Sequence, residues 1–334
     1  MGEFDLIDRF FTQPAKALYT PAVHVGIGDD CAVLQPAPNA QLLVSSDMMV
    51  EGRHFFADTD PYRLGHKALA TNLSDLAACG ATPLGFTLAL ALPKVDESWL
   101  DPFSKGMLAL AQHSACPLVG GDTTSGPLTI SITVFGQIPQ DQALLRSGAK
   151  VGHDIYVTGA IGEARAGLHL LEKRWECNNK PLRDHLIRRL EAPTPRLAIG
   201  HHLRGVASSA MDLSDGLRGD LGHLLKASQV GARINGNALL STAPRLWMSA
   251  ETSAWTETQK IAFAMAGGDD YELLFTAHPG FRAYLTELGQ ELGVGITRIG
   301  EVLASLDMKV VDTAGQICTL ETASFDHFKS CSRA

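Results

Sequence analysis

The sequence predicts an α/β protein with two domains, and three observations support this prediction. At 334 residues the chain is longer than one ordinary core requires, so two domains of common size are expected. Its first third alternates apolar runs typical of strands with segments whose apolar residues recur at helical spacing. With 45% hydrophobic and 19% charged residues, the composition is that of a globular protein and not of a disordered one.

The alternation starts with a strand and a helix that each carry an aspartate. Residues 42–52 (LLVSSDMMVEG) begin apolar and turn polar, which suits a buried strand with Asp47 near its end. Residues 63–79 have apolar side chains at helical spacing and are followed by Gly and Pro, so we expect a helix there. This helix places Asp75 among small and apolar neighbours.

A second strand, a helix and a third strand complete the N-terminal half. They are expected at residues 84–93, 101–115 and 128–138, with Asp101 as a possible N-cap of the helix. Before the last strand, the run CPLVGGDTTSG opens into a Gly-rich turn that bears Asp122.

The second domain is expected to begin at Arg146, where a basic, Gly-containing connector precedes a new strand. The predicted domains are therefore 1–145 and 146–334. A helix at 161–173 and an Arg-rich, Pro-bounded linking segment at 180–196 follow. Two further blocks stand out, a strand and helix at 208–228 and a Gly turn and strand at 266–277, whereas residues 236–259 permit no assignment.

Charge and cysteine usage exclude several classes of protein. The formal net charge of -8 argues against a general nucleic-acid or membrane-surface binder, because those have an excess of Lys and Arg. The six cysteines form no C-x-x-C pair, which is typical of free thiols in a reducing cytoplasm. No leader pattern opens the chain and its most apolar stretch is too short for a bilayer, so a cytoplasmic protein is expected.

Aspartates next to glycines recur along the chain, as GIGDD at 26–30, GGD at 120–122 and GGDD at 267–270. Turn and cap chemistry explains most single Gly-Asp pairs, and Asp29, Asp101 and Asp220 need no more than this. A larger set lies at or just past apolar elements, with no Lys or Arg beside most of its members. The set consists of Asp30, Asp47, Asp75, Asp122, Asp212 and Asp215. Because buried carboxylates need a counter-charge and oxygen-rich clusters favour hard cations, the set predicts Mg²⁺ sites and hence phosphate ligands.

Other chemistries lack their signatures. The twelve histidines show no H-x-x-x-H or H-E-x-x-H spacing, which argues against zinc. No G-x-S-x-G elbow is present, and Ser214 is better explained as a helix-start hydroxyl or a ligand contact. Because neither a Walker A loop nor the protein-kinase motifs occur, any ATP binds by another route.

Eight blocks along the chain resemble one family in order and spacing. They are GIGDDCAVL, LLVSSDMMVEGRHF, ALATNLSDLAACGATPLGFTLALALP, LVGGDTTSGP, RSGAKVGHDIYVTG, MDLSDGL, GGDDYELLF and SFDHF. Together, from about residue 3 to residue 328, they resemble thiamine-monophosphate kinases of the PurM-like ATP-binding superfamily. The resemblance implies phosphoryl transfer from ATP to thiamine monophosphate, giving thiamine diphosphate and ADP. It also implies a PurM-like fold: an N-terminal α/β domain whose sheet pairs across a homodimer, a C-terminal α+β domain, and ATP between the two.

The resemblance also implies roles for individual residues. The expected Mg²⁺ ligands are Asp30, Ser45, Ser46, Asp47, Asp75, Asp122, Asp212 and Asp215. The residues expected to contact ATP are Gly121, Asp122, Arg146 and Ser214. The residues expected to contact thiamine phosphate are His54, either Asp269 or Glu272, and Phe325. No general base is needed, because the attacking phosphate oxygen is already ionised near neutral pH. Arg146 would grip phosphate oxygens with its planar guanidinium, and Phe325 would offer an aromatic face to the cationic thiazolium.

Three departures from the family pattern and several alternatives remain. Ser46 stands where threonine is common, Asp269 where glutamate is frequent, and residues 247–256 look like an insertion without an assigned role. His54 and Arg146 could be surface residues, and Phe325 could pack the C-terminus. The alternative functions are another PurM-like enzyme such as aminoimidazole ribonucleotide synthetase, a non-catalytic nucleotide sensor, or a metal-dependent phosphatase.

Overall fold

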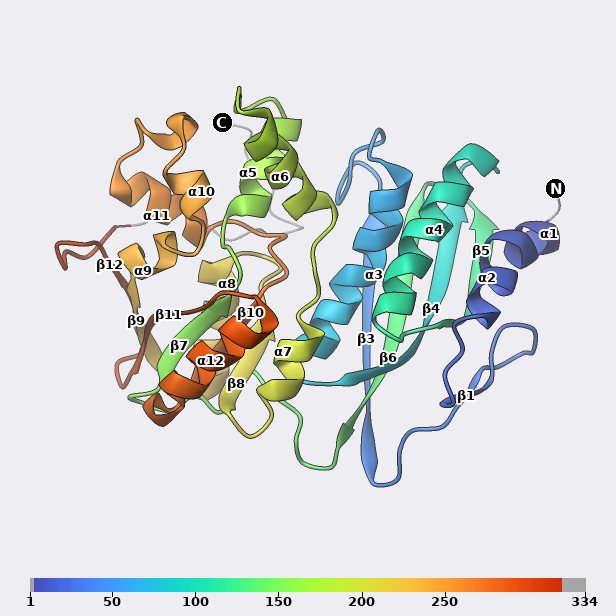
Figure 1. Cartoon of the computed structure of the whole chain (residues 1–334), viewed down its shortest axis with the longest axis horizontal. Helices are drawn as coiled ribbons and strands as arrows, with labels where there is room; N and C mark the ends of the chain where they lie inside the picture. The colour runs from blue at the N-terminus through green and yellow to red at the C-terminus, as the bar shows by residue number, and fades with distance from the viewer. Residues whose placement is uncertain (1–2, 320–334) are drawn as a thin grey trace. The chain divides into compact units, whose positions relative to one another are not determined.

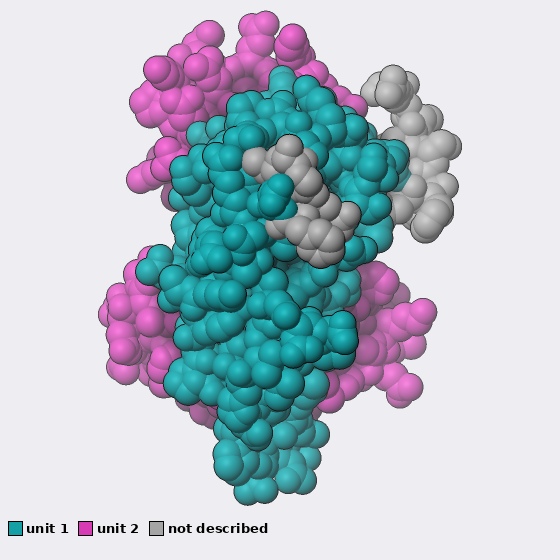
Figure 2. All heavy atoms as spheres, turned by 90° about the vertical axis from the view of Figure 1, so that its right-hand side faces the viewer, with its two compact units in different colours: residues 1–143 teal, residues 144–334 magenta. Residues whose placement is uncertain are grey.

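The computed structural model describes residues 3–319 and divides into two compact units, Met1–Ala143 and Leu144–Ala334. Figure 1 shows the elements in chain order, and Figure 2 colours the two units separately. Among the described residues, no helix combines the length and the apolar character that crossing a bilayer requires.

The first unit is a four-stranded sheet with the strand order β3-β6-β4-β5, and β1 and β2 form a separate ribbon. Its helices are α1 (Glu3–Ile7), a π-helical turn η1 (Asp8–Thr12), α2 (Gln13–Lys16), α3 (Pro61–Ala78) and α4 (Glu97–His113). Its strands are β1 (Val23–Val25), β2 (Val33–Leu34), β3 (Ala40–Val50), β4 (Thr82–Leu92), β5 (Leu118–Ser125) and β6 (Thr129–Pro139). The strands pair antiparallel except for β4 and β5, which are parallel.

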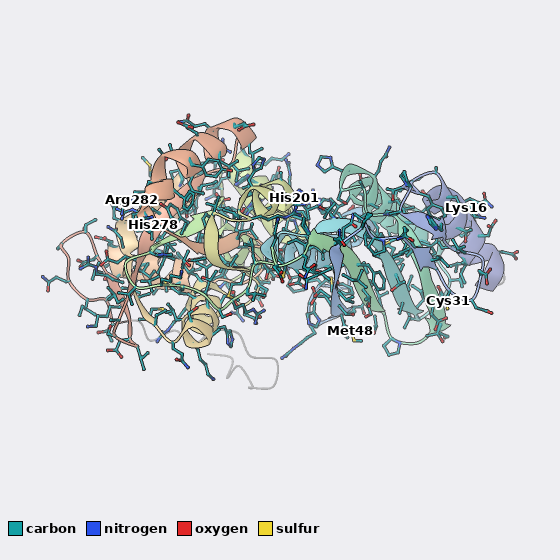
Figure 3. The ribbon with its side chains drawn as sticks, turned by 90° about the horizontal axis from the view of Figure 1, so that it is seen from below. Lys16, Cys31, Met48, His201, His278 and Arg282 are labelled. Carbon is teal, nitrogen blue, oxygen red and sulfur yellow. The ribbon has the colours of Figure 1, made fainter. Side chains whose placement is uncertain are left out.

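Helices α3 and α4 lie side by side against one face of this sheet (Figure 1). Side chains that point to these helices, such as Leu88 and Ile132, are buried, which is the alternation expected of a half-covered sheet. On the other face, Leu42, Val44 and Met48 of β3 are 54% to 58% exposed. Figure 3 shows Met48 projecting from this open side.

Three expectations for this unit are wrong in detail. The strand β3, expected to be buried, lies at the edge of the sheet, and Met49 is its one buried residue. Asp101 does not cap a helix, because α4 begins earlier: Asp96 is the N-cap and its carboxylate accepts the Ser98 N–H at 3.1 Å. Asp101 instead lies inside α4 and pairs with Lys105 at 2.6 Å. Asp122 does not lie in a turn but within β5, since residues 120–125 continue the parallel pairing with β4.

The second unit is a six-stranded sheet with the order β12-β9-β11-β7-β10-β8, antiparallel except for β12 and β9. Its strands are β7 (Asp154–Thr158), β8 (Ala207–Asp212), β9 (Gly231–Asn235), β10 (Leu273–Ala277), β11 (Ile296–Leu303) and β12 (Met308–Val311). Its α-helices are α5 (Glu163–Leu171), α6 (Lys180–Glu191), α7 (Leu197–His202), α8 (Leu217–Ser228), α9 (Gly236–Leu240), α10 (Pro244–Trp247), α11 (Glu257–Met265) and α12 (Arg282–Leu292), with 3-10 turns η2 (Ala250–Thr252) and η3 (Pro279–Phe281).

The stretch that the sequence left unassigned, 236–259, is a series of short helices that covers the core of this unit. Trp247 is 6% exposed and meets the Phe263 ring edge to face at 5.9 Å. Thr252 is fully buried and donates to the Leu246 carbonyl at 2.7 Å. These contacts give the segment a packing role.

Two glycines allow α3 and α4 to approach each other. A Cβ at Gly65 would overlap the Phe103 carbonyl oxygen, and a Cβ at Gly106 would overlap the carbonyl oxygen of Tyr62. Each helix therefore presents a glycine to the backbone of the other. Backbone groups cannot move aside as flexible side chains do, so the spacing of the two helices depends on these glycines.

We expect Gly106→Ala to lower the free energy of unfolding by about 1–3 kcal/mol, because overpacking outweighs the better helix propensity of alanine. Gly222 in α8 is the matched control, since nothing lies within 4 Å of a Cβ added there. Gly222→Ala should stabilise the protein by up to about 1 kcal/mol. Denaturant unfolding of both variants measures the difference, and equal shifts of the same sign would contradict the packing argument.

Candidate functional site

The first unit brings three of the predicted metal ligands to one side of its sheet. Ser45 and Asp47 alternate along β3 and so share a face. The Ser45 hydroxyl donates to Asp75 of α3 at 2.5 Å, and the Asp47 backbone N–H donates to the side chain of Asn72, one turn earlier in α3, at 3.1 Å. Strand β3 and helix α3 therefore bring side-chain oxygen atoms, which can serve as metal ligands, to the same place.

Ser46 and Asp122 lie on the opposite, open face of the same sheet. The Ser46 hydroxyl lies 2.9 Å from that of Thr133, its cross-strand neighbour in β6. The pairing register places Asp122 beside Ala89 of β4, in the same row as Ser131 and Met48. Asp122 is exposed, and its carboxylate accepts the N–H of Thr123 at 2.9 Å. Alternation along the strands thus separates the predicted ligands of this unit into two groups.

Gly121 beside Asp122 is required by a close approach of two strands. A Cβ at this position would overlap the carbonyl oxygen of Leu88 in β4. Because it has no side chain, Gly121 allows β5 to pair closely with β4. This pairing fixes the position of the next residue, Asp122.

The GIGDD loop is held by Tyr19. The Ile27 N–H donates to the Tyr19 hydroxyl at 2.7 Å, and a Cβ at Gly26 would overlap the Tyr19 ring. Asp30 follows on an exposed part of the loop, and its own N–H donates to the Asp29 carboxylate at 2.8 Å. Asp29 thus shapes the turn while Asp30 faces solvent.

In the second unit, two segments distant in sequence form one corner. Asp212 ends β8, and its pairing partner Leu273 begins β10. Beyond these ends, the Asp269 N–H donates to the Ser214 carbonyl at 2.9 Å and the Tyr271 N–H to the Leu213 carbonyl at 2.8 Å. These bonds bring together the predicted residues Asp212, Ser214, Asp215 and Asp269.

Asp220 shapes the loop that carries Ser214 and Asp215. Its carboxylate accepts the backbone N–H groups of residues 214, 215 and 216 at 3.1 to 3.2 Å. Burial and, after it, the nearby charge of Asp215 raise the pKa of Asp220 to about 7. Asp220 therefore has a larger part than the simple turn residue expected from the sequence.

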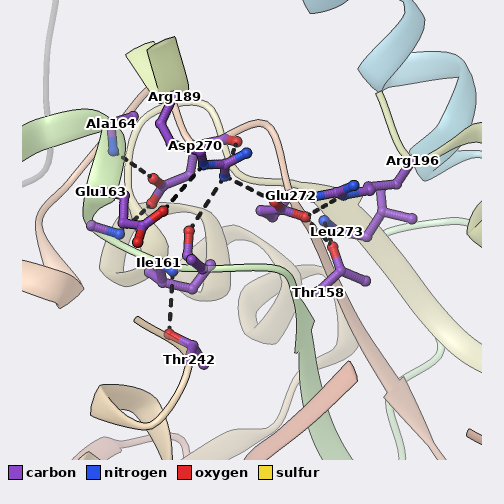
Figure 4. A network of polar contacts seen from close by, with 12 residues as sticks. Thr158, Ile161, Glu163, Ala164, Arg189, Arg196, Thr242, Asp270, Glu272 and Leu273 are labelled. Atoms are coloured by element: carbon purple, nitrogen blue, oxygen red, sulfur yellow. Dashed lines mark hydrogen bonds and ion pairs between the residues drawn. The ribbon is translucent and has the colours of Figure 1, made fainter. Parts of the chain in front are cut away.

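Glu272 is fully buried and lies within a network of charged groups (Figure 4). Arg196 donates to both of its carboxylate oxygens at 2.6 Å, and Arg189 donates to one of them at 2.9 Å. The Thr158 hydroxyl donates a further bond at 2.6 Å. Burial alone would raise the pKa of Glu272, but the hydrogen bonds and charge of Arg196 outweigh it and hold that pKa below its ordinary value.

Asp270 is buried next to the same network. It accepts the backbone N–H groups of Gly162 at 2.8 Å and of Ala164 at 3.3 Å, at the N-terminus of α5. A helix N-terminus is a favourable place for a carboxylate, because unsatisfied N–H groups and the helix dipole meet there. Burial raises the pKa of Asp270 to about 7, against the opposing effect of Arg189.

The remaining predicted residues are placed separately. Arg146 is exposed, and its carbonyl accepts the Ser228 hydroxyl at 3.2 Å. His54 is half-buried, and its Nδ1 accepts the Val50 N–H at 3.0 Å, which closes the turn after β3. Phe325 lies outside the described residues.

Within residues 3–319, no group of three or more His, Cys, Asp or Glu side chains is arranged to hold a metal ion. Asp30, Asp47, Asp75 and Asp122 belong to the first unit, and Asp212 and Asp215 to the second. A shared Mg²⁺ site formed by these carboxylates therefore stays a prediction. Arg189 and Arg196 were not among the site residues predicted from the sequence, and the Arg-rich composition of segment 180–196 was the available signal.

Comparison with known proteins defines the class first. Residues 28–138 match the family model described as AIR synthase related protein, N-terminal domain. Hydrogenase maturation protein HypE in complex with ATP, 18% identical, has the same fold with a TM-score of 0.72 over 97% of this chain and 96% of its own. The fold is therefore that of the AIR synthase-related, PurM-like proteins, as expected from the sequence.

Closer relatives identify the family. The chain is 44% identical over 327 residues to thiamine-monophosphate kinase of Escherichia coli K12, covering 98% of each, and 39% identical to that of Haemophilus influenzae, again covering 98% of each. The crystal structure of thiamine-monophosphate kinase from Stenotrophomonas maltophilia K279a is 41% identical, with a TM-score of 0.82 over 93% of this chain and 96% of its own. AaThiL complexed with AMPPCP and TMP is 30% identical, with a TM-score of 0.74 over 98% of this chain and 97% of its own. The chain belongs to the thiamine-monophosphate kinase family.

We expect Asp220→Ala to free the loop that carries Ser214 and Asp215, because three backbone N–H groups lose their acceptor. The free energy of unfolding should fall by about 1–3 kcal/mol. Hydrogen exchange at residues 214–216 should accelerate, whereas Asp184→Ala on the exposed side of α6 should leave it unchanged. Unchanged exchange in Asp220→Ala would show that the carboxylate does not hold the loop.

Proposed function

We propose that this protein transfers the γ-phosphoryl group of ATP to thiamine monophosphate and releases thiamine diphosphate and ADP. The observation that carries the proposal is full-length membership of the thiamine-monophosphate kinase family, at up to 44% identity among the relatives compared. The complex of AaThiL with AMPPCP and TMP, a protein 30% identical over 98% of this chain, supports the same pair of substrates.

The proposed metal is Mg²⁺, in more than one copy. The predicted donors are carboxylate and hydroxyl oxygens, which fit a hard cation, and the contact of Ser45 with Asp75 supports a cluster of such donors between β3 and α3. The residues proposed to hold the ions are Asp30, Ser45, Ser46, Asp47, Asp75, Asp122, Asp212 and Asp215. Bound Mg²⁺ would screen the repulsion between the donor and acceptor phosphates.

The protein's own groups bind and align the two substrates for a direct, in-line transfer. Gly121, Asp122, Ser214 and the exposed guanidinium of Arg146 are proposed to contact ATP. The acceptor is a phosphate oxygen that is already ionised near neutral pH, so no side chain has to remove a proton. Catalysis is then a matter of positioning and of stabilising charge.

On the acceptor side, His54, Asp269 and Phe325 are proposed to contact thiamine phosphate. Asp269 is half-exposed, whereas the Glu272 carboxylate is buried and already bonded to two arginines. Of the two alternatives in the acidic turn, this supports Asp269. Glu272 would then hold the turn in place through its bonds to the arginines instead of contacting the substrate.

A homodimer formed through the first unit is part of the proposal. Strand β3 is an edge strand of 11 residues, and its exposed apolar side chains Leu42, Val44 and Met48 lie on the open face of the sheet. Long apolar edge strands are normally covered, because they otherwise cause uncontrolled association. A second copy of the chain is the proposed cover. The free thiols among the described residues support a cytoplasmic location.

The activity is tested by incubating the purified protein with ATP, Mg²⁺ and thiamine monophosphate. Equal amounts of thiamine diphosphate and ADP are expected. Release of inorganic phosphate would indicate a phosphatase instead, and absence of turnover would favour a nucleotide sensor. An aminoimidazole ribonucleotide synthetase-like enzyme would turn over only with its own substrate.

We expect Asp47→Ala and Asp122→Ala to reduce kcat by more than about 100-fold while the fold is kept, because each removes a proposed ligand of the charge-stabilising cations. Circular dichroism and the unfolding midpoint check the fold. Asp58→Ala is the control, because Asp58 is exposed in the loop between β3 and α3. Near-normal turnover in either of the first two variants would count against the metal assignment.

We expect Val44→Lys to shift the protein from dimer to monomer in analytical ultracentrifugation, since a charge would be placed in the proposed interface. Val95 is 52% exposed and lies outside the sheet, so Val95→Lys controls for the effect of an added lysine. A monomeric wild-type protein, or a dimer unaffected by Val44→Lys, would contradict this arrangement.

A further inference from the structure

The strongest unassigned feature is the way in which Arg196 holds Glu272. Arg196 is the N-cap of α7, and its Nε and Nη2 atoms donate to the two oxygens of Glu272 at 2.6 Å each. This two-pronged geometry restricts the carboxylate in direction as well as in distance. The side chain of Arg196 is 15% exposed and that of Glu272 is not exposed, so the pair is shielded from water.

The position of Glu272 determines where the turn before β10 lies. The Thr158 hydroxyl donates to Glu272 at 2.6 Å and accepts the Leu273 N–H at 2.8 Å, which ties the turn to the end of β7. On the other side of Glu272, its carbonyl accepts the Leu213 N–H at 2.9 Å. Side chain and main chain of Glu272 thus join three segments of the unit.

The same turn supports the loop that carries Ser214. The N–H groups of Asp269 and Tyr271 in the turn donate to the carbonyls of Ser214 and Leu213 in the loop. Together with the bond from the Leu213 N–H to the Glu272 carbonyl, the loop and the turn exchange main-chain bonds in both directions. Asp269 has φ 63 and Tyr271 has φ 47, which are conformations that non-glycine residues rarely adopt without support from their surroundings. The turn therefore depends on its anchors.

We propose that Arg196 is a positioning residue: through Glu272 it fixes the turn with Asp269 and, through the shared main-chain bonds, the loop with Ser214 and Asp215. The inference rests on the proposed function, in which this turn contacts thiamine phosphate and this loop contacts ATP and Mg²⁺. Loosening the Arg196 anchor would then disturb the binding of both substrates at once.

Stability alone does not account for this pair. The desolvation of a buried ion pair offsets much of its attraction, so well-packed apolar residues often serve a purely structural role as well. Asp154 provides the comparison within the same sheet: Arg282 donates to its two oxygens at 2.6 and 2.9 Å. Asp154 pairs with Ala277, the last residue of β10, whereas Glu272 precedes its first, so the two ion pairs lie at opposite ends of the strand.

The test compares Arg196→Met and Arg196→Lys with Arg282→Met and Arg282→Lys. For Arg196→Met, we expect kcat/KM for both ATP and thiamine monophosphate to fall by about 10-fold to 100-fold at a temperature where the variant is folded. Arg196→Lys should have kcat/KM values between those of Arg196→Met and the wild type, because lysine keeps the positive charge but cannot bond both carboxylate oxygens as the guanidinium does. The Arg282 variants should retain wild-type values. Wild-type kcat/KM in folded Arg196→Met, or an equal loss in Arg282→Met, would overturn the proposal.

Hydrogen exchange at the amides of Leu213, Asp269 and Tyr271 gives a readout that does not require activity. Exchange should accelerate in Arg196→Met by about tenfold or more relative to the wild type, and not in Arg282→Met. If the wild-type protein makes no thiamine diphosphate but the exchange changes as expected, the proposed function fails and the anchoring stands. If activity is present and the exchange is unchanged, the anchoring fails.

A milder pair of variants decides the matter if Arg196→Met does not fold. Thr158→Val removes the hydroxyl between Glu272 and Leu273 but leaves the charges paired. Thr276→Val removes an equally buried hydroxyl from the far end of β10, where it contacts the hydroxyl of Ser209 at 2.7 Å. Lower kcat/KM for both substrates only in Thr158→Val would support the proposal, and equal values in the two variants would overturn it.

Discussion

A carboxylate that is removed from water must find cations or N–H donors, and this requirement organises the second unit around Asp270 and Glu272. Asp270 finds its donors at the N-terminus of α5 and Glu272 finds them in two arginines. Because these two anchors are only two residues apart, the turn that holds them has little freedom. Asp269 lies in this turn, and its main-chain N–H bonds to the Ser214 carbonyl, so the loop at Ser214 is held in place as well. In the proposed site such rigidity would favour phosphoryl transfer, because the groups need not reorganise during the reaction.

The first unit meets a related requirement in a different way. Its oxygen-rich side chains lie on a strand and a helix that face each other, where Ser45 donates to Asp75. There the Asp75 carboxylate accepts a hydroxyl and the Asp47 main-chain N–H donates to the Asn72 side chain, while in the second unit two arginines donate to the buried Glu272. Asp270 and Glu272 are thus bonded within the protein and hold the shape of the turn.

Local patterns predicted the elements well where periodicity was strong. The helix expected at 63–79 is α3 at Pro61–Ala78, and the strand expected at 42–52 is β3 at Ala40–Val50. The errors arose where two local signals competed, as at Asp96 and Asp101, or where a partner strand decided the outcome, as at Asp122. The bond between Arg196 and Glu272 spans 76 residues, and no local pattern contains such a pairing. The family resemblance predicts which acids belong to a site, but it does not predict which of them are bonded within the protein, as Glu272 is.

Strand β3 carries two different surfaces on alternate residues, with Ser45 and Asp47 toward α3 and Val44 and Met48 away from it. An insertion or deletion of one residue within this strand would exchange the two sets, because successive side chains point to opposite faces. Beyond the point of change, the Asp47 carboxylate would then be presented to solvent and Met48 to the helix. Length variation in this protein should therefore be tolerated in the loops that flank β3 but not inside the strand itself.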